Sequence, residues 1–170
     1  MEQVIVVNPA LLAASCLFMG LGLWLLLAAT NNLLDRSTNT KLLYRMCSME
    51  DIRKDQDLGV GLLSRSIESL SFVKSILLFG IFVEYIISIA LVFSSMLIGA
   101  LAFGIEAIPR DVSILISGVA LSAYMLLWFA FLISGLWFAY WIKLGEVQSV
   151  HFTLLIIAIA SQILFHVSLL

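Results

Sequence analysis

Hydrophobic residues fill four long stretches of this chain, and most polar residues gather between the first stretch and the second. The stretches are residues 4–30, 75–105, 112–142 and 147–170. A helix needs about 20 mostly apolar residues to cross the hydrocarbon core of a bilayer. Backbone polar groups in lipid must hydrogen-bond within their own segment, so each stretch predicts a spanning helix. The sequence therefore predicts an all-α, four-helix transmembrane bundle that forms a single integral membrane domain over residues 1–170.

The connections between these stretches differ greatly in length. We expect residues 31–74 to form one large extramembrane loop between helices 1 and 2. The other two connections, around Pro109 and Gly145, are so short that the helices they join should be antiparallel neighbours. In the large loop, the run Ser48-Met49-Glu50-Asp51 has the form of a capping box with Ser48 as N-cap. A short surface helix and a solvated loop both fit this segment.

Charge is scarce and unevenly distributed. Charged residues make up 12% of the chain, against about a quarter in soluble proteins, and thirteen of the twenty lie between Asp35 and Lys74. The net charge of −2 gives no reason to expect nucleic acid as a partner. Cys16 and Cys47 form neither a disulfide framework nor a metal-binding spacing. We expect the partners to be the lipid bilayer and other membrane protein subunits.

The distribution of lysine and arginine predicts the orientation in the membrane. Connections one and three hold eight of these residues, while the termini and connection two hold one. The positive-inside rule then places both termini outside and the large loop in the cytoplasm. We expect an integral protein of a bacterial inner membrane.

Each predicted span has a face of small or polar residues. Membrane helices associate through such faces, because lipid is as apolar as leucine. On the second span the face comprises Gly80, Glu84, Ser88, Ser95 and Gly99; on the third, Ser113, Ser117, Tyr124, Trp128 and Gly135; on the fourth, His151, Ala158, Gln162 and His166. Most of this pattern is expected from helix packing alone.

Several sequence elements resemble a family of predicted small integral membrane proteins, a four-span domain of unknown function. They are the run Asn31-Asn32-Leu33-Leu34-Asp35-Arg36-Ser37-Thr38-Asn39, the Ser-Met-Glu-Asp element, Arg65 before the second span, Glu84 within it, and the tryptophan-rich end of the third span. The resemblance implies four spans and points to Asn31, Asn32, Asp35, Asn39 and Arg65 as a family motif. It implies no activity. It argues for the opposite orientation, since relatives with a basic second connection would keep that connection and both termini inside. The chain departs from the family pattern at Leu136 and His151, which replace a glutamate and a basic residue.

Glu84 is the strongest single candidate for a functional residue. It lies about ten residues, or roughly 15 Å, into its span, where an ionisable side chain should face protein or water. It would be a protonated acid that acts as a proton relay or cation ligand, or one that holds helices together through a hydrogen bond to Tyr124 or a serine. No lysine or arginine lies inside a span to pair with it.

Other candidate sites carry weaker signals. His151 and His166 are possible haem or quinone ligands, but both lie on one helix, and polar rings also anchor helix ends. Asn31, Asp35 and Asn39 have a spacing of four that suits a hard cation, although such residues more often cap helices and start turns. Trp128, Trp137, Tyr140 and Trp141 are interpreted as an interfacial aromatic belt. We predict no metal site.

Three functions fit these features. The first is a non-catalytic accessory subunit of a larger membrane complex of respiratory, photosynthetic or oxidase type, with no enzymatic activity and no cofactor of its own. The second is a small proton, cation or solute transporter that uses Glu84. The third is an electron-transfer subunit that binds haem or quinone through His151 or His166. The sequence favours the first, because it contains no nucleophile–base pair and no phosphate-binding loop.

Overall fold

The structure, a computed structural model, describes residues 7–55 and 57–170, and all the regular secondary structure in these residues is helical. In chain order the elements are α1 (Pro9–Leu34), α2 (Arg36–Cys47), α3 (Glu50–Lys54), the 3-10 helix η1 (Val60–Arg65), α4 (Leu70–Ala102), α5 (Arg110–Trp137), the 3-10 helix η2 (Tyr140–Ile142) and α6 (Gly145–Val167). Four of them, α1, α4, α5 and α6, are long and apolar enough to cross a membrane. The prediction of four spanning helices is confirmed.

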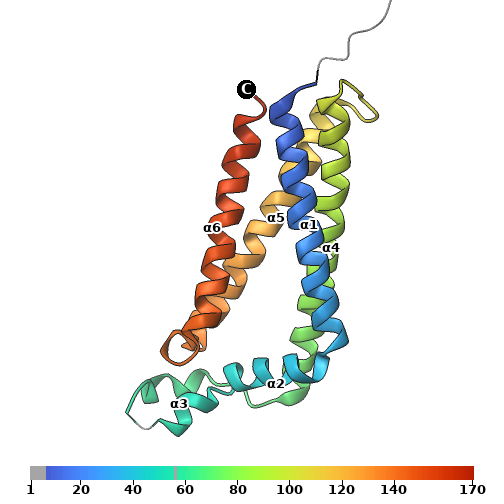
Figure 1. The fold of residues 1–170 in the computed structure, drawn as a ribbon. Helices are drawn as coiled ribbons and strands as arrows, with labels where there is room; N and C mark the ends of the chain where they lie inside the picture. The colour runs from blue at the N-terminus through green and yellow to red at the C-terminus, as the bar shows by residue number, and fades with distance from the viewer. Residues whose placement is uncertain (1–6, 56) are drawn as a thin grey trace, which may run out of the picture.

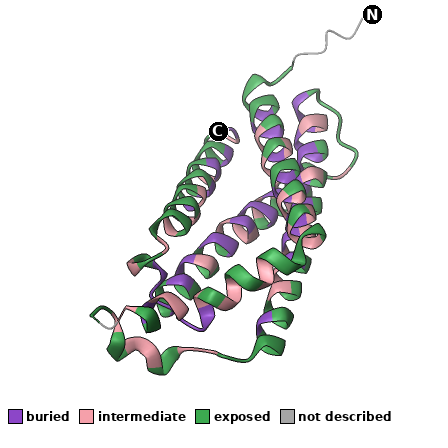
Figure 2. Cartoon of the chain, turned by 60° about the horizontal axis from the view of Figure 1, so that its bottom comes forward, coloured by how far each residue is buried: buried purple, intermediate pink, exposed green. Residues whose placement is uncertain are grey.

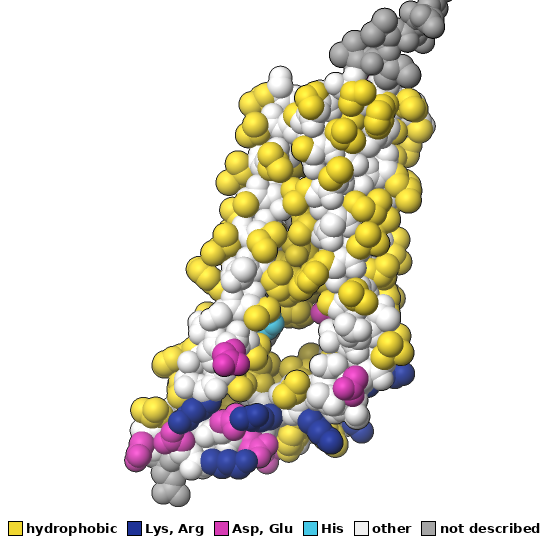
Figure 3. All heavy atoms as spheres, viewed as in Figure 1, with side chains coloured by type: hydrophobic (Ala, Val, Ile, Leu, Met, Phe, Trp, Pro, Cys, Tyr) yellow, Lys and Arg dark blue, Asp and Glu magenta, His cyan; other side chains and the backbone are white. Residues whose placement is uncertain are grey.

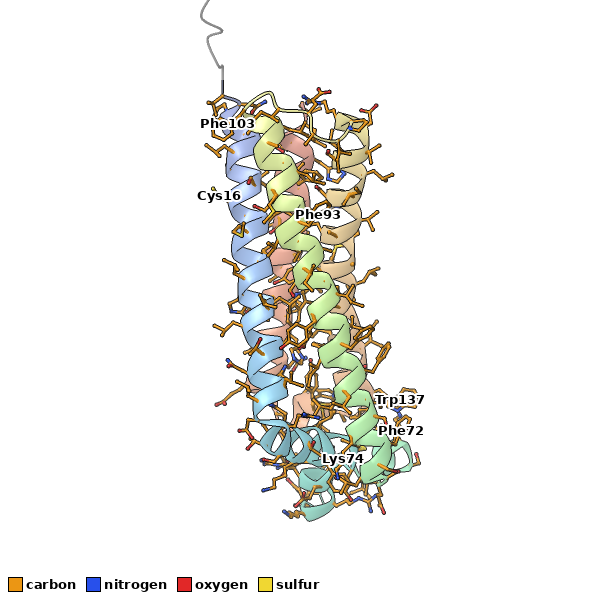
Figure 4. All side chains as sticks on the ribbon, turned by 90° about the vertical axis from the view of Figure 1, so that its right-hand side faces the viewer. Cys16, Phe72, Lys74, Phe93, Phe103 and Trp137 are labelled. Atoms are coloured by element: carbon orange, nitrogen blue, oxygen red, sulfur yellow. The ribbon has the colours of Figure 1, made fainter. Side chains whose placement is uncertain are left out.

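The helix boundaries differ somewhat from the expected ones. The start expected at residue 4 lies outside the described residues, and α1 continues four residues beyond the expected end. α4 has 33 residues, which is about 50 Å of helix and longer than the ~30 Å hydrocarbon core. Figure 4 shows Phe103 and Lys74 near opposite ends of α4, with Phe93 between them. The first turns of α4, which carry Lys74, therefore project beyond the hydrocarbon.

The large loop expected over residues 31–74 is wrong, because most of this segment is helical. α1 stops at Leu34, and only Asp35 separates it from α2. The Asp35 backbone leaves the helical region (φ −110°, ψ 56°), and its carboxylate accepts a hydrogen bond from the Thr38 N–H at 3.2 Å. Figure 1 shows α2 running across the end of the bundle, in a different direction from α1. One residue thus ends the first span and starts a helix in a new direction.

The capping box expected at Ser48 is also absent. Ser48 is the C-cap of α2, and α3 starts after Met49, whose backbone is left-handed (φ 54°). No side chain caps α3. The hydroxyl of Ser48 turns back toward the Arg45 carbonyl (3.5 Å) and is unavailable to the next helix.

α1 and α4 form the tightest helix pair in the molecule, and small side chains hold them together. The Ser15 hydroxyl donates to the Ser95 carbonyl and the Ser95 hydroxyl donates to the Ser15 carbonyl, both at 2.8 Å. One Cβ added at Gly22 would lie 3.0 Å from the Val92 backbone nitrogen and 3.1 Å from the Ser88 carbonyl oxygen. The two backbones therefore approach each other as closely as small-residue packing in membranes allows.

α5 and α6 form a second pair that leans away from the first. α5 crosses behind α1 and α4, and α6 returns beside it, so the two pairs diverge toward the end where α2 lies (Figure 1). The interior face of α5 contains five of the small or polar residues singled out in the sequence, and all are buried: Ser113, Ser117, Tyr124, Trp128 and Gly135. Figure 2 shows the buried residues where helices meet and exposed ones on the outward faces. These outward faces are apolar, as lipid requires.

The segment α2–α3–η1, here called the end cap, closes one end of the bundle. Cys47 and Ile52 of the end cap pack with Val73 of α4 and Phe138 after α5. Asp55 forms an ion pair with Lys143. The hydrogen bond from Lys143 is the main reason why the pKa of the Asp55 carboxyl is lowered. Most charged side chains gather at this end of the molecule (Figure 3). The end cap is therefore a folded part of the domain.

We predict that Gly22→Ala destabilises the fold by about 1–3 kcal/mol, because its Cβ would press on the α4 backbone. Gly20→Ala is the matched control: nothing lies within 4 Å of its Cβ, so it should be neutral or stabilise by about 0.5–1 kcal/mol. Unfolding in mild detergent, followed by circular dichroism, measures both. Equal midpoints for the two variants would contradict the close α1–α4 contact.

We also predict that Cys47 resists alkylation. Burial raises the pKa of its thiol to about 11, so at pH 8 its thiolate fraction is on the order of a hundredfold below that of an ordinary cysteine. Both proteins carry Cys16→Ala, so that Cys47 is the remaining native cysteine. The control protein also carries Ser64→Cys, which places a cysteine at an exposed position of η1. Iodoacetamide should modify the introduced cysteine quickly and Cys47 only after denaturation or at much higher pH. Similar rates would show that the end cap is not packed as described.

Candidate functional site

Glu84 is buried in the bundle and has an amide partner on the neighbouring helix. Its side chain is 6% exposed, and the Asn32 Nδ2 donates a hydrogen bond to its Oε2 at 3.2 Å. Asn32 lies two residues before the end of α1. The partner is therefore Asn32, and the expected hydrogen bond to Tyr124 or a serine is not formed. Only one carboxyl oxygen is engaged in this contact.

Glu84 lies nearer to the capped end of α4 than to its other end. The other ends of α1 and α4 meet where the Asn8 N–H donates to the Ala102 carbonyl (2.8 Å). Glu84 is eighteen residues from Ala102, about 27 Å along a helix, whereas the hydrocarbon core is ~30 Å thick. The carboxyl thus sits close to the α1–α2 corner, fourteen residues after the start of α4, and its depth in the bilayer stays a prediction.

The family motif at the end of α1 builds this corner. The Asp35 N–H donates to the Asn31 carbonyl (3.0 Å), and the Asn39 Nδ2 donates to the Asp35 carbonyl (3.0 Å). The hydrogen bond from the Thr38 N–H is the main cause that lowers the pKa of the Asp35 carboxyl. No group of three or more His, Cys, Asp or Glu side chains that could hold a metal ion occurs among the described residues. Asn31, Asp35 and Asn39 therefore shape the backbone, and Asn32 alone reaches Glu84.

Arg65 of η1 contacts the end of α5, at the end of the bundle that the end cap closes. Its guanidinium carbon lies 5.1 Å from the centre of the Trp137 ring, within the range of a cation–π interaction. This contact ties η1 to the end of α5. Both the asparagine-rich run and the arginine of the family motif thus hold the end cap against the bundle.

A cluster of aromatic rings around His151 occupies the space between α5 and α6 at this end. The ring centre of His151 lies 5.3 Å from Phe131, 6.0 Å from Tyr140 and 6.1 Å from Trp128. Trp128 also packs edge-on against Tyr124 (5.6 Å) and contacts Trp24 of α1 (5.9 Å). We call these six residues the His151 cluster. It connects both helix pairs.

Four polar atoms of the His151 cluster are buried without a hydrogen-bond partner among the described residues. They are Tyr124 Oη, Trp128 Nε1, Tyr140 Oη and His151 Nδ1. Tyr124 is 0%, Tyr140 2% and Trp128 4% exposed. A buried polar group without a partner is unfavourable by roughly 1–3 kcal/mol, so native proteins satisfy nearly all of them with protein, water or a ligand. The cluster therefore has unused hydrogen-bonding capacity.

Gly135 makes room for one ring of this cluster. A Cβ at this position would overlap the ring of Tyr140, which folds back over the end of α5. Ala139, directly before Tyr140, has a left-handed backbone (φ 52°) that turns the chain back. The tyrosine is thus held under His151 by a tight turn and a glycine.

The two histidines do not come together. His166 is in the last turn of α6, and its Nδ1 lies 2.8 Å from the Gln162 carbonyl of the same helix. His151 is in the second turn of α6, near the end cap. They lie at opposite ends of one helix, so the structure does not bring them together as two ligands of one haem.

His166 borders a groove of about 480 Å³ on the outer side of α5 and α6. The Gln162 Nε2 donates to the Ser122 hydroxyl across this groove at 3.4 Å, while Gln162 Oε1 is buried with no partner among the described residues. Gly118 and Ala123 keep the groove wide on the α5 side. Polar groups therefore line a groove that otherwise faces lipid.

Most of the chain is similar to a described protein family. The family described as "Predicted small integral membrane protein (DUF2165)" matches residues 10–168. The chain belongs to this family. The match covers all four spanning helices of the DUF2165 chain and its end cap. No curated protein and no solved structure is similar enough to match.

Sequence reasoning placed part of the His151 cluster in the wrong environment. Trp137 and Trp141 are exposed, as an interfacial belt requires, but Trp128 and Tyr140 are buried. The position of Trp128 on the small-residue face of α5 was the signal for its burial. Nothing in the sequence indicated that Tyr140 turns back over Gly135.

We predict that Gly135→Ala displaces Tyr140 and destabilises the fold by about 1–3 kcal/mol. Gly118→Ala, on the same helix, is the control because its Cβ would meet only Phe165 at 3.9 Å, an ordinary contact. Thermal unfolding in detergent gives the stability, and near-ultraviolet circular dichroism reports the aromatic packing. Unchanged aromatic signals in Gly135→Ala would contradict the described packing of Tyr140.

Proposed function

We propose that this DUF2165 protein is a non-catalytic subunit of a larger protein complex, of respiratory, photosynthetic or oxidase type, in a bacterial inner membrane. The observation that carries the proposal is the α5–α6 groove of about 480 Å³, in which the side chains of Gln162 and Ser122 bring polar groups to a surface that otherwise faces lipid. Polar side chains in a spanning helix are unfavourable against lipid and normally meet protein. The groove is therefore the docking site for a spanning helix of another subunit.

The groove also suggests what kind of helix would fit. Its floor is formed by small residues of α5, namely Gly118, Ser122 and Ala123, so a partner backbone can approach closely. The partner helix should therefore carry small residues along the face that lies against α5.

The two alternative functions receive less support. A pathway for protons or cations through Glu84 would need polar groups along the length of the bundle, whereas the side-chain hydrogen bond of this carboxyl is to Asn32 at the end of α1. Haem binding by two histidines of this chain would need facing ligands, and His151 and His166 are separated along one helix. Docking needs only the groove that the structure shows.

We predict that Gly118→Leu, which fills the groove, releases the chain from its complex without unfolding it. Gly20→Leu is the control, since it adds the same bulk at a position of α1 with nothing within 4 Å. The measurement is the stoichiometry of larger membrane subunits that co-purify with each tagged variant in mild detergent. Wild type and Gly20→Leu should retain fixed partners and Gly118→Leu should lose them. A wild-type chain that always purifies alone, or partners that remain in Gly118→Leu, would contradict the proposal.

A further inference from the structure

We propose that Arg65 and Trp137 bind the phosphate head group of an anionic phospholipid at the edge of the end cap. Arg65 is the last residue of η1 and Trp137 is the last residue of α5, so the site joins the end cap to the spanning helices. The ligand is one lipid molecule at a fixed position, in addition to the lipid that surrounds the bundle. This site is separate from the α5–α6 groove and independent of the docking proposed there.

The first argument is that the protein does not neutralise the charge of Arg65. Arg65 is exposed, and the four ion pairs found among the described residues all use other cations. The acidic residue nearest to it in the sequence, Glu68, is paired with Arg53. The guanidinium of Arg65 therefore offers its positive charge to an anion from outside the protein.

The second argument is that this guanidinium is held in place while its N–H groups stay free. Its central carbon lies 5.1 Å from the centre of the Trp137 ring, a contact that uses no oxygen acceptor. Arg45 and Arg53 donate to oxygen atoms of the chain, whereas Arg65 donates to none within residues 7–55 and 57–170. Arginine donors match two oxygens of one phosphate in parallel. A phosphate would therefore bind a cation that is already positioned.

The third argument is the apolar surface beside the cation. The side chain of Trp137 is 55% exposed, and that of Phe72, in the first turn of α4, is 48% exposed. Figure 4 shows both side chains on the same side of the molecule, near the end cap. Exposed aromatic rings next to charged residues are typical of the membrane–water interface. The glycerol and acyl chains of a lipid would pack on these rings while its phosphate reaches Arg65.

The fourth argument concerns the charge of the head group. Arg53 donates to the hydroxyl of Ser66, the residue after Arg65, at 2.7 Å, so a second guanidinium lies beside the site. Arg53, Arg65 and Glu68 carry two positive charges and one negative charge, which leaves a net charge of +1. A zwitterionic lipid would bring an ammonium group to this positive surface. A lipid with a net negative charge, such as phosphatidylglycerol, fits it better.

The test is a calorimetric titration of the purified full chain, in nonionic detergent, with dioctanoyl phosphatidylglycerol. One molecule should bind per chain, and dioctanoyl phosphatidylcholine should bind about fivefold more weakly. Glycerol phosphate, which has the head group without acyl chains, should not bind at the same concentrations. Equal affinity for the two lipids, equal binding of glycerol phosphate, or no saturable binding would overturn the proposal.

Two arginine variants locate the site. Arg65→Gln removes the guanidinium and should weaken the binding of phosphatidylglycerol roughly tenfold. Arg110→Gln is the control, because it removes the same charge from an exposed position at the other end of the bundle, and its affinity should equal that of wild type. If the two variants bind the lipid equally well, the attraction depends on net charge alone and the proposal fails.

A second pair of variants leaves the contact between Arg65 and Trp137 in place. Ser64→Glu puts a carboxylate at an exposed position next to the guanidinium and should weaken binding about threefold, whereas the neutral Ser64→Gln should not. This pair decides the matter if Arg65→Gln loosens the end cap, which rapid alkylation of Cys47 would reveal. Equal affinities of Ser64→Glu and Ser64→Gln would overturn the proposal.

Discussion

The close contact between the backbones of α1 and α4 is the constraint on which the rest of the structure depends. Lipid supplies no hydrophobic force to bring helices together, so packing and interhelical hydrogen bonds must do so. Gly22 allows the backbones to meet, and the two hydrogen bonds between Ser15 and Ser95 fix the register of the pair. With that register, Asn32 at the end of α1 lies beside Glu84. The position of the buried carboxyl is therefore a consequence of small residues far from it.

The second constraint is the corner at Asp35. A helix that left the membrane without a turn would carry α2 away from the bundle. Because Asp35 ends α1 and caps α2, the end cap lies across the bundle and packs on Val73 and Phe138. This arrangement explains the asymmetry of charge, since most charged residues gather at the capped end. It also closes the space that contains the His151 cluster from one side.

Much of the architecture could be predicted from hydropathy alone, because four apolar stretches in lipid have no stable alternative to helices. The small-residue face of α5 could also be predicted from the sequence, and its residues Ser113, Ser117 and Gly135 are all buried. Gly80 shows the limit of this reasoning. It shares a face with Glu84 in the sequence, yet nothing lies within 4 Å of its Cβ, because the helix pairs diverge.

Several features of the candidate site could not be predicted from the hydrophobic periodicity of the sequence. The end cap mixes polar and apolar residues at the membrane surface, where neither a helix nor a loop is favoured by composition, so tertiary packing decides. The position of Tyr140 depends on a left-handed residue, Ala139, and on the absence of a side chain at Gly135. The partner of Glu84 depends on the register of α1 and α4, which brings Asn32 beside it.

Disulfide formation between α1 and α4 tests the central constraint most directly. The Ser15 and Ser95 hydroxyl oxygens lie 3.2 Å apart, so Ser15→Cys with Ser95→Cys, in a chain with Cys16→Ala and Cys47→Ala, should cross-link readily under mild oxidation. Ser15→Cys with Met96→Cys is the reference, because Met96 is the next residue but faces outward (60% exposed). The account predicts near-complete cross-linking of the first pair and little of the second. Equal cross-linking of both pairs, or none of the first, would contradict it.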